Sequence, residues 1–400
     1  MKIGIIREGK IPPDARVLLT PEQCKKIEAN LPVDILVEPS ENRVFEDEEY
    51  EKQNVTLSKD MESCKVLMGV KEVPIMNLIP NKTYFFFSHT IKEQVYNRKL
   101  LQAILAKNIR LIDYEVLTNE RGQRLIAFGR FAGMVGAHNG LWTYGKRTGA
   151  FELKRMKDHK DYAEAQAFYK TVKFPPIRIV LTGTGRVGKG AAEVLEDMGI
   201  QKVKPKDFLN QTYDHAVYTQ LVCSNYAQRK DGSAFHKQDF YDHPEWFEAK
   251  FAPYTQVSDL MINGIYWDNN APAFFTKEEM KSKDFKIKVI ADVTCDIAPV
   301  SSIPSTLKAS TIADPVFGYD PRTEAATKAF QADCIDMMTI DNLPNELPRD
   351  ASQSFGNQFI KYILPELLKD ESDTLERATV AENGQLGKYF QYLGSYINGE

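Results

Sequence analysis

The glycine-rich stretch Gly183-Thr-Gly185-Arg-Val-Gly188 constrains the fold of this chain more than any other feature of the sequence. It follows an apolar strand pattern at residues 178–182 and leads directly into a helix pattern. Glycines at this spacing allow a tight turn and a close approach of the backbone to a ligand, while the helix N-terminus offers backbone N–H groups to a phosphate. The strand, turn and helix therefore predict a dinucleotide-binding α/β domain.

The strand that follows this helix bears on the choice between NAD and NADP. The sequence predicts that strand near residues 201–207, a segment that contains three lysines and does not finish in an obvious acid. An acidic residue would bind the ribose hydroxyls and favour NAD, whereas lysines could pair with the 2′-phosphate of NADP. We expect NAD or NADP as the cofactor, with a slight preference for NAD, and no metal ion.

Two titratable side chains stand where apolar strands end in the first part of the chain. Lys71 follows the run 66–70, and His89 follows the run 84–88. Partial burial at such positions would lower both pKa values toward neutrality, which suits proton transfer. Either residue alone is typical of a solvated loop lysine or a hydrogen-bonded histidine. Together with a hydride carrier, the pair predicts redox chemistry on an amine and a carbonyl.

Alternating apolar runs and helical stretches predict two sheets. The expected strands are 2–7, 34–37, 66–70, 84–88 and 110–113 in a first series, and 178–182, 201–207, 259–263, 286–292 and 338–341 in a second. This alternation is typical of parallel sheets covered by helices. We expect an α/β protein with two Rossmann-like domains, whose parallel sheets are flanked by helices and which meet over an active-site cleft.

The order of these elements suggests the domain boundaries. Residues 1–135 together with 345–400 are expected to form the substrate domain, and residues 136–344 the dinucleotide-binding domain. Gly133, Gly136 and Gly140 would let a helix pack closely against a neighbour. An excursion at about 207–257 is too long for an ordinary connection. Its His236, Asp239, Asp242 and His243 could be read as metal ligands, but they lack a firm ligand spacing, and that reading is disfavoured.

Composition indicates what kind of partner to expect. The chain has 400 residues, 43% of them hydrophobic and 26% charged, and its formal net charge is -4. This balance gives no electrostatic case for nucleic acid or an anionic membrane. No signal peptide is visible, no apolar run approaches the ~20 residues that span a bilayer, and the five cysteines follow no metal or redox spacing. We expect a cytoplasmic protein with small-molecule partners, whose oligomeric state is not predicted.

Several stretches, in order over nearly the whole chain, match one family pattern. They are Asp14-Ala-Arg16, Leu19-Thr-Pro21, Lys71-Glu72, His89, Tyr114-Glu115, Arg124, Phe131-Ala-Gly133, Asn263-Gly-Ile-Tyr266, Asp292-Val-Thr and residues 340–352. Together they resemble the saccharopine dehydrogenases that form lysine and the related lysine-ketoglutarate reductases. Arg16, Lys71 and His89 are shared with the broader alanine dehydrogenase and transhydrogenase superfamily.

The resemblance implies an activity and a role for each matched residue. The activity is the reductive condensation of an amino acid with a 2-oxo acid, lysine and 2-oxoglutarate, or its reverse. Lys71 and His89 would be the acid–base pair. The resemblance also implies that Arg16 and Arg124 anchor carboxylates, that Glu72 and Glu115 lie near Lys71 and the substrate amine, and that Arg186, Val187, Tyr266, Asp341, Asn342 and Leu343 lie beside the nicotinamide.

Two alternatives stay open at this stage. An alanine dehydrogenase-like enzyme would aminate a small 2-oxo acid with ammonia, and Asp296 matches an acidic residue of that branch. A non-catalytic nucleotide sensor would keep the fold and lose turnover, which the retention of Lys71 and His89 disfavours.

Overall fold

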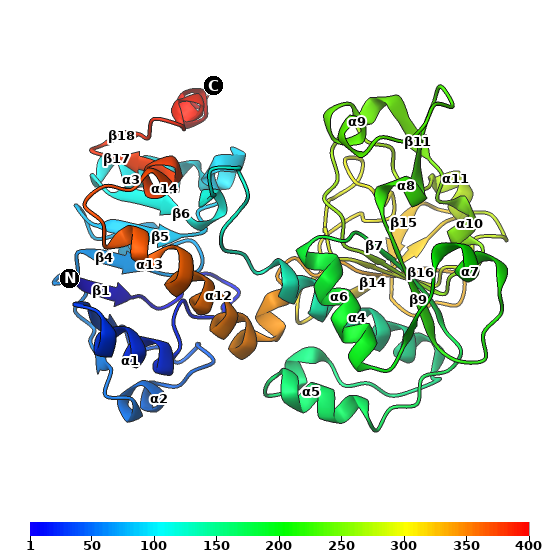
Figure 1. Ribbon diagram of the computed structural model, residues 1–400, viewed down its shortest axis with the longest axis horizontal. Helices are drawn as coiled ribbons and strands as arrows, with labels where there is room; N and C mark the ends of the chain where they lie inside the picture. The colour runs from blue at the N-terminus through cyan, green and yellow to red at the C-terminus, as the bar shows by residue number, and fades with distance from the viewer. Residues whose placement is uncertain (400) are drawn as a thin grey trace. The chain divides into compact units, whose positions relative to one another are not determined.

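The computed structural model describes residues 1–399 as two units, each with its own sheet. Unit 1 comprises Met1–Phe128 and Pro348–Glu400, and unit 2 comprises Gly129–Leu347. Figure 1 shows strands in the interior of each unit and helices around them.

Unit 1 has an eight-stranded sheet in the order β18-β17-β6-β5-β4-β1-β2-β3. The six strands from β6 to β3 run parallel, and β17 pairs antiparallel with β6 at one side. The strands are β1 (Lys2–Ile5), β2 (Asp34–Val37), β3 (Thr56–Leu57), β4 (Val66–Met68), β5 (Thr83–Phe86), β6 (Arg110–Asp113), β17 (Thr379–Glu382) and β18 (Gln385–Leu386). All five strands predicted in this region are therefore confirmed, within a few residues at their ends.

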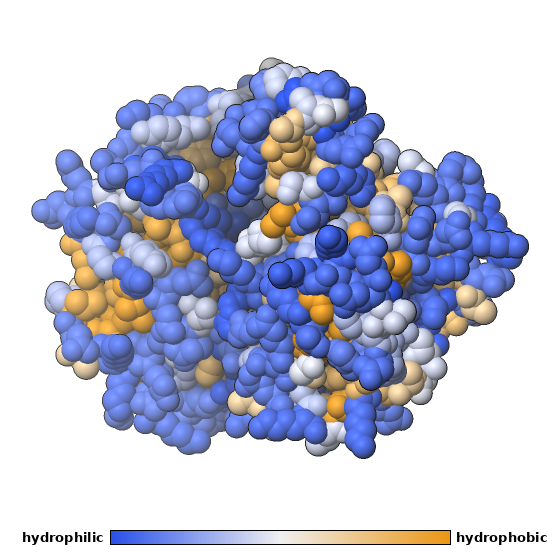
Figure 2. All heavy atoms as spheres, turned by 45° about the vertical axis from the view of Figure 1, so that its right-hand side comes forward, coloured by the Kyte–Doolittle hydropathy of each residue, from blue (hydrophilic) through white to orange (hydrophobic). Residues whose placement is uncertain are grey.

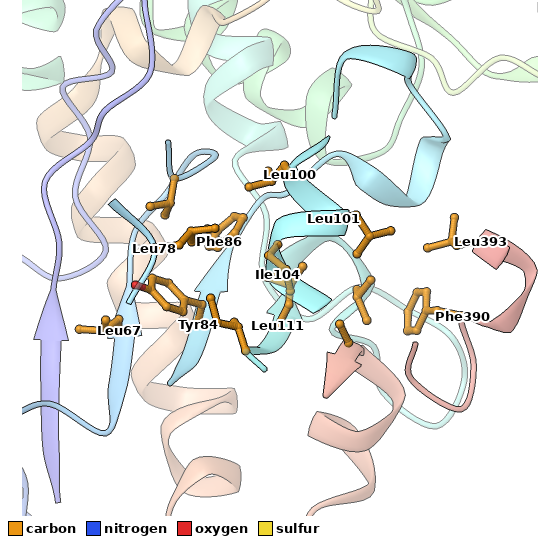
Figure 3. Packing of buried hydrophobic residues seen from close by; sticks show 14 of the residues in the cluster. Leu67, Leu78, Tyr84, Phe86, Leu100, Leu101, Ile104, Leu111, Phe390 and Leu393 are labelled. Carbon is orange, nitrogen blue, oxygen red and sulfur yellow. The ribbon is translucent and has the colours of Figure 1, made fainter. Parts of the chain in front are cut away.

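Helices cover both faces of this sheet. They are α1 (Pro21–Asn30), α2 (Asp47–Lys52), α3 (Arg98–Ala106), α12 (Pro348–Tyr362), α13 (Leu364–Leu367), α14 (Asp373–Ala378) and α15 (Gly394–Asn398). Tyr84 and Phe86 of β5 point to the face that packs against Ile104 of α3 (Figure 3). Phe85 points to the other face, where its ring centroid lies 6.4 Å from that of Phe359 in α12. This alternation explains why β5 is apolar throughout, because both of its faces are buried.

Unit 2 repeats the same plan with the order β15-β14-β16-β13-β12-β7-β9-β8. The six strands from β16 to β8 are parallel, and β14 pairs antiparallel with β16 and β15. The strands are β7 (Arg178–Thr182), β8 (Gln201–Lys202), β9 (Val217–Leu221), β12 (Leu260–Asn263), β13 (Val289–Asp292), β14 (Val316–Asp320), β15 (Ala325–Thr327) and β16 (Ile335–Met338). Both sheets are thus mostly parallel, with antiparallel strands at one side, and the α/β class is confirmed.

The helices of unit 2 include one long helix, α4, packed on the sheet and on α6. They are α4 (Gly129–Thr148), α5 (Tyr162–Tyr169), α6 (Arg186–Asp197), α7 (Pro205–Asn210), α8 (Cys223–Tyr226), α9 (Lys237–Asp242), α10 (Ala252–Thr255) and α11 (Lys277–Met280). A Cβ atom added at Gly133 would lie 1.9 Å from the carbonyl oxygen of Val187 in α6. The prediction that Gly133, Gly136 and Gly140 allow this helix to pack closely against its neighbours is therefore confirmed.

Three sequence predictions in unit 2 need correction. The segment 201–207 is a strand only at β8, because Pro205 starts helix α7. The strand that pairs directly with β7 is β9, which lies inside the predicted excursion. The last parallel strand ends at Met338 instead of beginning there. What remains of the excursion holds a two-stranded sheet of β10 (Ala227–Arg229) and β11 (Phe247–Ala249).

The helices of the described residues are not suited to crossing a membrane. Within residues 1–399, no helix combines the length and the apolar character needed to cross a bilayer. The face drawn in Figure 2 is largely hydrophilic, and its apolar residues gather in several separate patches.

Candidate functional site

Four side chains follow the carboxyl ends of parallel strands in unit 1. Glu8, Lys71 and His89 each lie three residues beyond the end of β1, β4 and β5, and Glu115 lies two residues beyond β6. These strands are neighbours in the order β6-β5-β4-β1. Because the carboxyl ends of parallel strands meet at one edge of the sheet, the fold gathers these groups there.

Lys71 is held at its place by Glu8. The Glu8 carboxylate accepts the backbone N–H of Val70 at 2.6 Å through Oε1 and that of Lys71 at 2.8 Å through Oε2. Burial lowers the pKa of Lys71 to about 8, and the nearby charge of Arg16 acts in the same direction. A lysine with this pKa exchanges protons readily near neutral pH, as acid–base catalysis requires.

Glu72 orients His89. Nδ1 of His89 lies 2.5 Å from Oε1 of Glu72, and Nζ of Lys10 lies 3.3 Å from Oε2 of the same carboxylate. Burial raises the pKa of Glu72, but the hydrogen bond and charge of His89 outweigh it and bring the pKa to about 2. The ionised carboxylate therefore accepts the Nδ1 proton and fixes the orientation of the His89 ring. His89 itself adopts a left-handed backbone with φ of 52°, a conformation that is uncommon for non-glycine residues.

Arg16 is buried and already paired. Its Nε and Nη2 donate to the two carboxylate oxygens of Asp14 at 2.9 and 2.6 Å. Its guanidinium lies 4.3 Å from the ring centroid of Phe128. The structure thus places the fixed charge of Arg16 close enough to lower the pKa of Lys71.

The ring of Phe87 lies between Arg124 and His89, and Glu115 is next to Arg124. The guanidinium of Arg124 is 5.4 Å from the ring centroid of Phe87, and that ring stacks on His89 with centroids 6.5 Å apart. Nη1 of Arg124 is 3.9 Å from Oε1 of Glu115, which also pairs with Lys92 at 3.2 Å. All six residues predicted for proton transfer and substrate binding therefore belong to unit 1, and they include two ion pairs, Glu72 with His89 and Glu115 with Arg124.

The sequence analysis missed Glu8 and Lys10. Both lie in the loop after β1, which was expected to continue as a strand to residue 7. The signal that could have found Glu8 was its position, since it directly follows the predicted strand 2–7 as Lys71 and His89 follow theirs.

A cavity of about 740 Å³ opens at the carboxyl ends of β7, β9 and β12 in unit 2. Gly183, which follows β7, has φ of 93°, a conformation that L side chains rarely adopt. A Cβ atom at Gly188 would lie 2.1 Å from the carbonyl oxygen of Gly183, whereas one at Gly185 would meet no atom within 4 Å. The turn therefore brings the first turn of α6 against β7 and leaves Gly185 facing the open cavity, as pyrophosphate binding requires.

The predicted cofactor residues divide into three groups. Gly183, Gly185 and Tyr266 line the cavity, with Tyr266 93% exposed. Gly188 is buried beneath the turn, beside Arg186 and Val187 in the first turn of α6. The third group, Asp341, Asn342 and Leu343, follows β16; Leu343 is buried and Asp341 is exposed.

A buried polar network supports the floor of this cavity. Oγ1 of Thr182 donates to Asn263 at 2.7 Å, and Nδ2 of Asn263 donates to Asp292 at 2.9 Å. Burial raises the pKa of Asp292, while donors on Thr306, Thr294 and Asn263 oppose the rise. These bonds tie together the ends of β7, β12 and β13, which explains why polar residues close three apolar strands.

Two of the four residues considered as metal ligands have structural partners. Asp239 pairs with Arg229 at 3.0 Å, and the ring of His243 stacks on Trp246 with centroids 4.0 Å apart. Residues 1–399 contain no group of three or more His, Cys, Asp or Glu side chains placed to hold a metal ion.

Comparison with known proteins relates the chain to amino-acid dehydrogenases. Residues 4–135 match the family model described as alanine dehydrogenase/PNT, N-terminal domain. The mitochondrial alpha-aminoadipic semialdehyde synthase of Bos taurus is 31% identical over 95% of this chain, and the chain spans 46% of that relative's length. The saccharopine dehydrogenase [NAD(+), L-lysine-forming] of Emericella nidulans is 26% identical, with 93% of both chains covered.

The solved structures agree on the fold. An L-alanine dehydrogenase superposes with a TM-score of 0.67 at 15% sequence identity, covering 99% of this chain and 100% of that one. The transhydrogenase from Sinorhizobium meliloti gives a TM-score of 0.59 at 12% identity.

Proposed function

We propose that the chain belongs to the saccharopine dehydrogenase branch of the alanine dehydrogenase and transhydrogenase superfamily, and that it is a nicotinamide-dependent oxidoreductase acting on the CH–NH bond of an amino acid. Its reaction is the reductive joining of the side-chain amine of lysine to 2-oxoglutarate, or the reverse. The observation that carries this proposal is the placement of Lys71, with a pKa lowered to about 8, and the Glu72–His89 pair at one sheet edge.

The proton steps follow from these groups. The free amine attacks the carbonyl carbon, and the resulting carbinolamine loses water to give a protonated imine, so that addition of hydride yields a neutral amine. Lys71 and His89 between them take the proton that leaves nitrogen and give the proton that the departing oxygen needs. Glu72 keeps His89 in one tautomer and stabilises its charged form. When bound, the reduced dinucleotide supplies the hydride that the imine carbon accepts.

The substrate carries carboxylates that need cationic partners. Arg124 is the proposed anchor, because its guanidinium lies over Phe87 beside His89 and can bind a carboxylate through two parallel hydrogen bonds. Glu115, next to Arg124, is proposed to meet the ammonium group of the amino acid. Arg16, already bonded to Asp14, is proposed to act as a fixed charge that tunes Lys71.

We propose NADP(H) as the preferred dinucleotide, in place of the slight preference for NAD that the sequence suggested. Dinucleotide folds that select NAD place an acid at the end of the strand next to the glycine turn. That strand is β9, and it is followed by Val222, Cys223 and Ser224, with no carboxylate among them. The cofactor residues proposed to contact the dinucleotide are Gly183, Gly185, Gly188, Arg186, Val187, Tyr266, Asp341, Asn342 and Leu343.

A substrate panel tests the proposal. The purified chain is mixed with NADPH or NADH and either lysine with 2-oxoglutarate or ammonia with pyruvate, and oxidation of the reduced dinucleotide is followed by absorbance. We expect turnover with lysine and 2-oxoglutarate, faster with NADPH. Turnover only with ammonia and pyruvate would establish the alanine dehydrogenase-like alternative, and binding without any turnover would indicate a nucleotide sensor. The variants Lys71→Met and His89→Gln should each lose most of the activity.

A further inference from the structure

The segment between β9 and β12 contains an ordered subdomain that the reaction chemistry does not explain. This insert, residues 222–251, holds α8, β10, α9 and β11, which Figure 1 shows together at one end of unit 2. Its strands pair in register from Ala227↔Ala249 to Arg229↔Phe247. A crossover between parallel strands such as β9 and β12 needs only about a dozen residues, usually one helix, so the longer insert calls for a further explanation.

Aromatic residues hold the insert together. The ring centroid of Phe240 lies 5.8 Å from that of Phe235 and 5.1 Å from that of Phe247. The ring of Tyr226 lies edge-on to Phe274 in the segment after β12, with centroids 5.0 Å apart. The insert is thus a packed unit fixed to the main body of unit 2, and its exposed side chains have defined positions.

One side of the insert faces the cavity that holds the glycine turn. Tyr226, Phe240, Tyr241 and Lys237 line the same cavity as Gly185. Tyr266 and Trp267 line it from the segment after β12. Tyr241 is 56% exposed and Tyr266 is 93% exposed. Large aromatic faces left open around a concave site of this volume are typical of a binding site for a flat ligand.

Lys237 brings a positive charge to the open end of β9. Its ammonium lies 5.3 Å from the ring centroid of Tyr241. Burial raises the pKa of Cys223, which follows β9, and the charge of Lys237 opposes that rise, so the two side chains are near each other. In a dinucleotide fold the end of this strand faces the ribose of the adenosine.

We propose that the insert builds the adenosine end of the dinucleotide site, with Tyr241 stacking on the purine ring and Lys237 pairing with a phosphate on the ribose 2′-oxygen. This inference rests on the proposed function only in that both place a dinucleotide in this cavity. A base stacks on an aromatic side chain through its π-face, and a lysine pairs with a phosphate as a point charge.

Nucleotide titration without turnover tests the inference. Dissociation constants of ADP and 2′,5′-ADP are measured by calorimetry on the full chain and on Tyr241→Ala, Lys237→Ala and the control Glu248→Ala. Glu248 lies on β11 and is bonded to Gln228, and it does not line the cavity. We expect Tyr241→Ala to weaken both nucleotides about tenfold. Lys237→Ala should weaken only 2′,5′-ADP, also by about tenfold. Melting temperatures equal to that of the unmodified chain establish that each variant is folded.

The possible results separate this inference from the proposed function. If Tyr241→Ala and Lys237→Ala bind both nucleotides as tightly as Glu248→Ala does, the insert is not the adenosine site, whether or not the enzyme turns over. The same conclusion follows if the unmodified chain binds neither nucleotide. If the variants behave as expected and no substrate pair is reduced, the inference stands and the proposed reaction is wrong.

Discussion

The proposed proton-transfer role of Lys71 comes with a cost in stability. Burial lowers its pKa from an ordinary 10.5 to about 8, so folding disfavours the protonated form that the unfolded chain holds. The unfolded chain binds more protons than the folded chain between these two pKa values, and stability therefore rises with pH across that range. Below pH 8 the full cost is present.

The first prediction concerns the removal of this charge. At pH 7, Lys71→Met should be more stable than the unmodified chain by about 1 to 3 kcal/mol, because it removes a buried ammonium. The gain should shrink as the pH rises from 8 and should be mostly lost by about pH 10.5. Chemical denaturation at both pH values measures it. Lys65→Met, at an exposed position before β4, is the control and should change stability little at either pH. A Lys71→Met variant that is less stable at pH 7 would contradict the burial of the charge.

The second prediction concerns Glu72. In Glu72→Gln the amide can no longer stabilise a charged His89 or fix its tautomer, so kcat should fall by about a hundredfold or more. KM should change much less, because the proposed carboxylate anchor is untouched. Glu38→Gln, a carboxylate after β2 that pairs with Arg7, should keep full activity. Steady-state kinetics of both variants check this, and equal kcat values would remove Glu72 from the proton chemistry.

The sequence could predict the candidate proton-transfer residues of the site, but not the residues that hold them in position. Lys71 and His89 were found because a polar residue after an apolar run is visible in the sequence. Glu8 also follows a predicted strand, but its role and that of Lys10 depend on contacts with the loop after β4 and with Glu72. Contacts between loops that are about sixty residues apart leave no local pattern.

The glycine turn and helix α6 form one element, and Gly185 and Gly188 are constrained in different ways. Gly188 has no room for a side chain because the carbonyl of Gly183 is too close, whereas Gly185 faces the cavity.

The third prediction follows from this difference between Gly188 and Gly185. Gly188→Ala should destabilise the chain by about 1 to 3 kcal/mol through overpacking. Gly185→Ala should keep its melting temperature and lose dinucleotide affinity, because its methyl group occupies space meant for the pyrophosphate.

Thermal melting and dinucleotide titration of the two variants check this prediction together. Equal melting temperatures would show that α6 does not need the close approach at Gly188. Unchanged affinity in Gly185→Ala would show that the ligand does not pass over the turn.

At the scale of elements, the strands that the sequence revealed are those with a nearly unbroken apolar run. β9 was missed because its sequence, Val-Tyr-Thr-Gln-Leu, mixes polar and apolar residues; Gln220 bonds to the carbonyls of Gly183 and Gly188. β16 was misplaced because it contains the buried Asp336, which pairs with Arg147 at 2.8 Å. In both strands a polar side chain has a tertiary partner that no local pattern reveals.

Across the whole molecule, the proposed reaction divides its chemistry between the two units. Unit 1 carries Lys71, His89 and Arg124, and unit 2 carries the glycine turn and its cavity. Two repeated α/β plans were predictable, because alternating strands and helices fill both halves of the sequence. The proposed cofactor site belongs to unit 2 because the glycine turn comes after the first series of strands in the sequence.

Transfer of deuterium tests the central claim most directly. The chain is supplied with lysine, 2-oxoglutarate and NADPH labelled with deuterium on each face of C4 in turn, and the product is examined by mass spectrometry and NMR. We expect one of the two labelled forms to place deuterium on the carbon that joins the lysine nitrogen to the former 2-oxo acid, and Lys71→Met to form little of this product. A product without deuterium at that carbon, or deuterium found only on alanine when pyruvate and ammonia are supplied instead, would contradict the account.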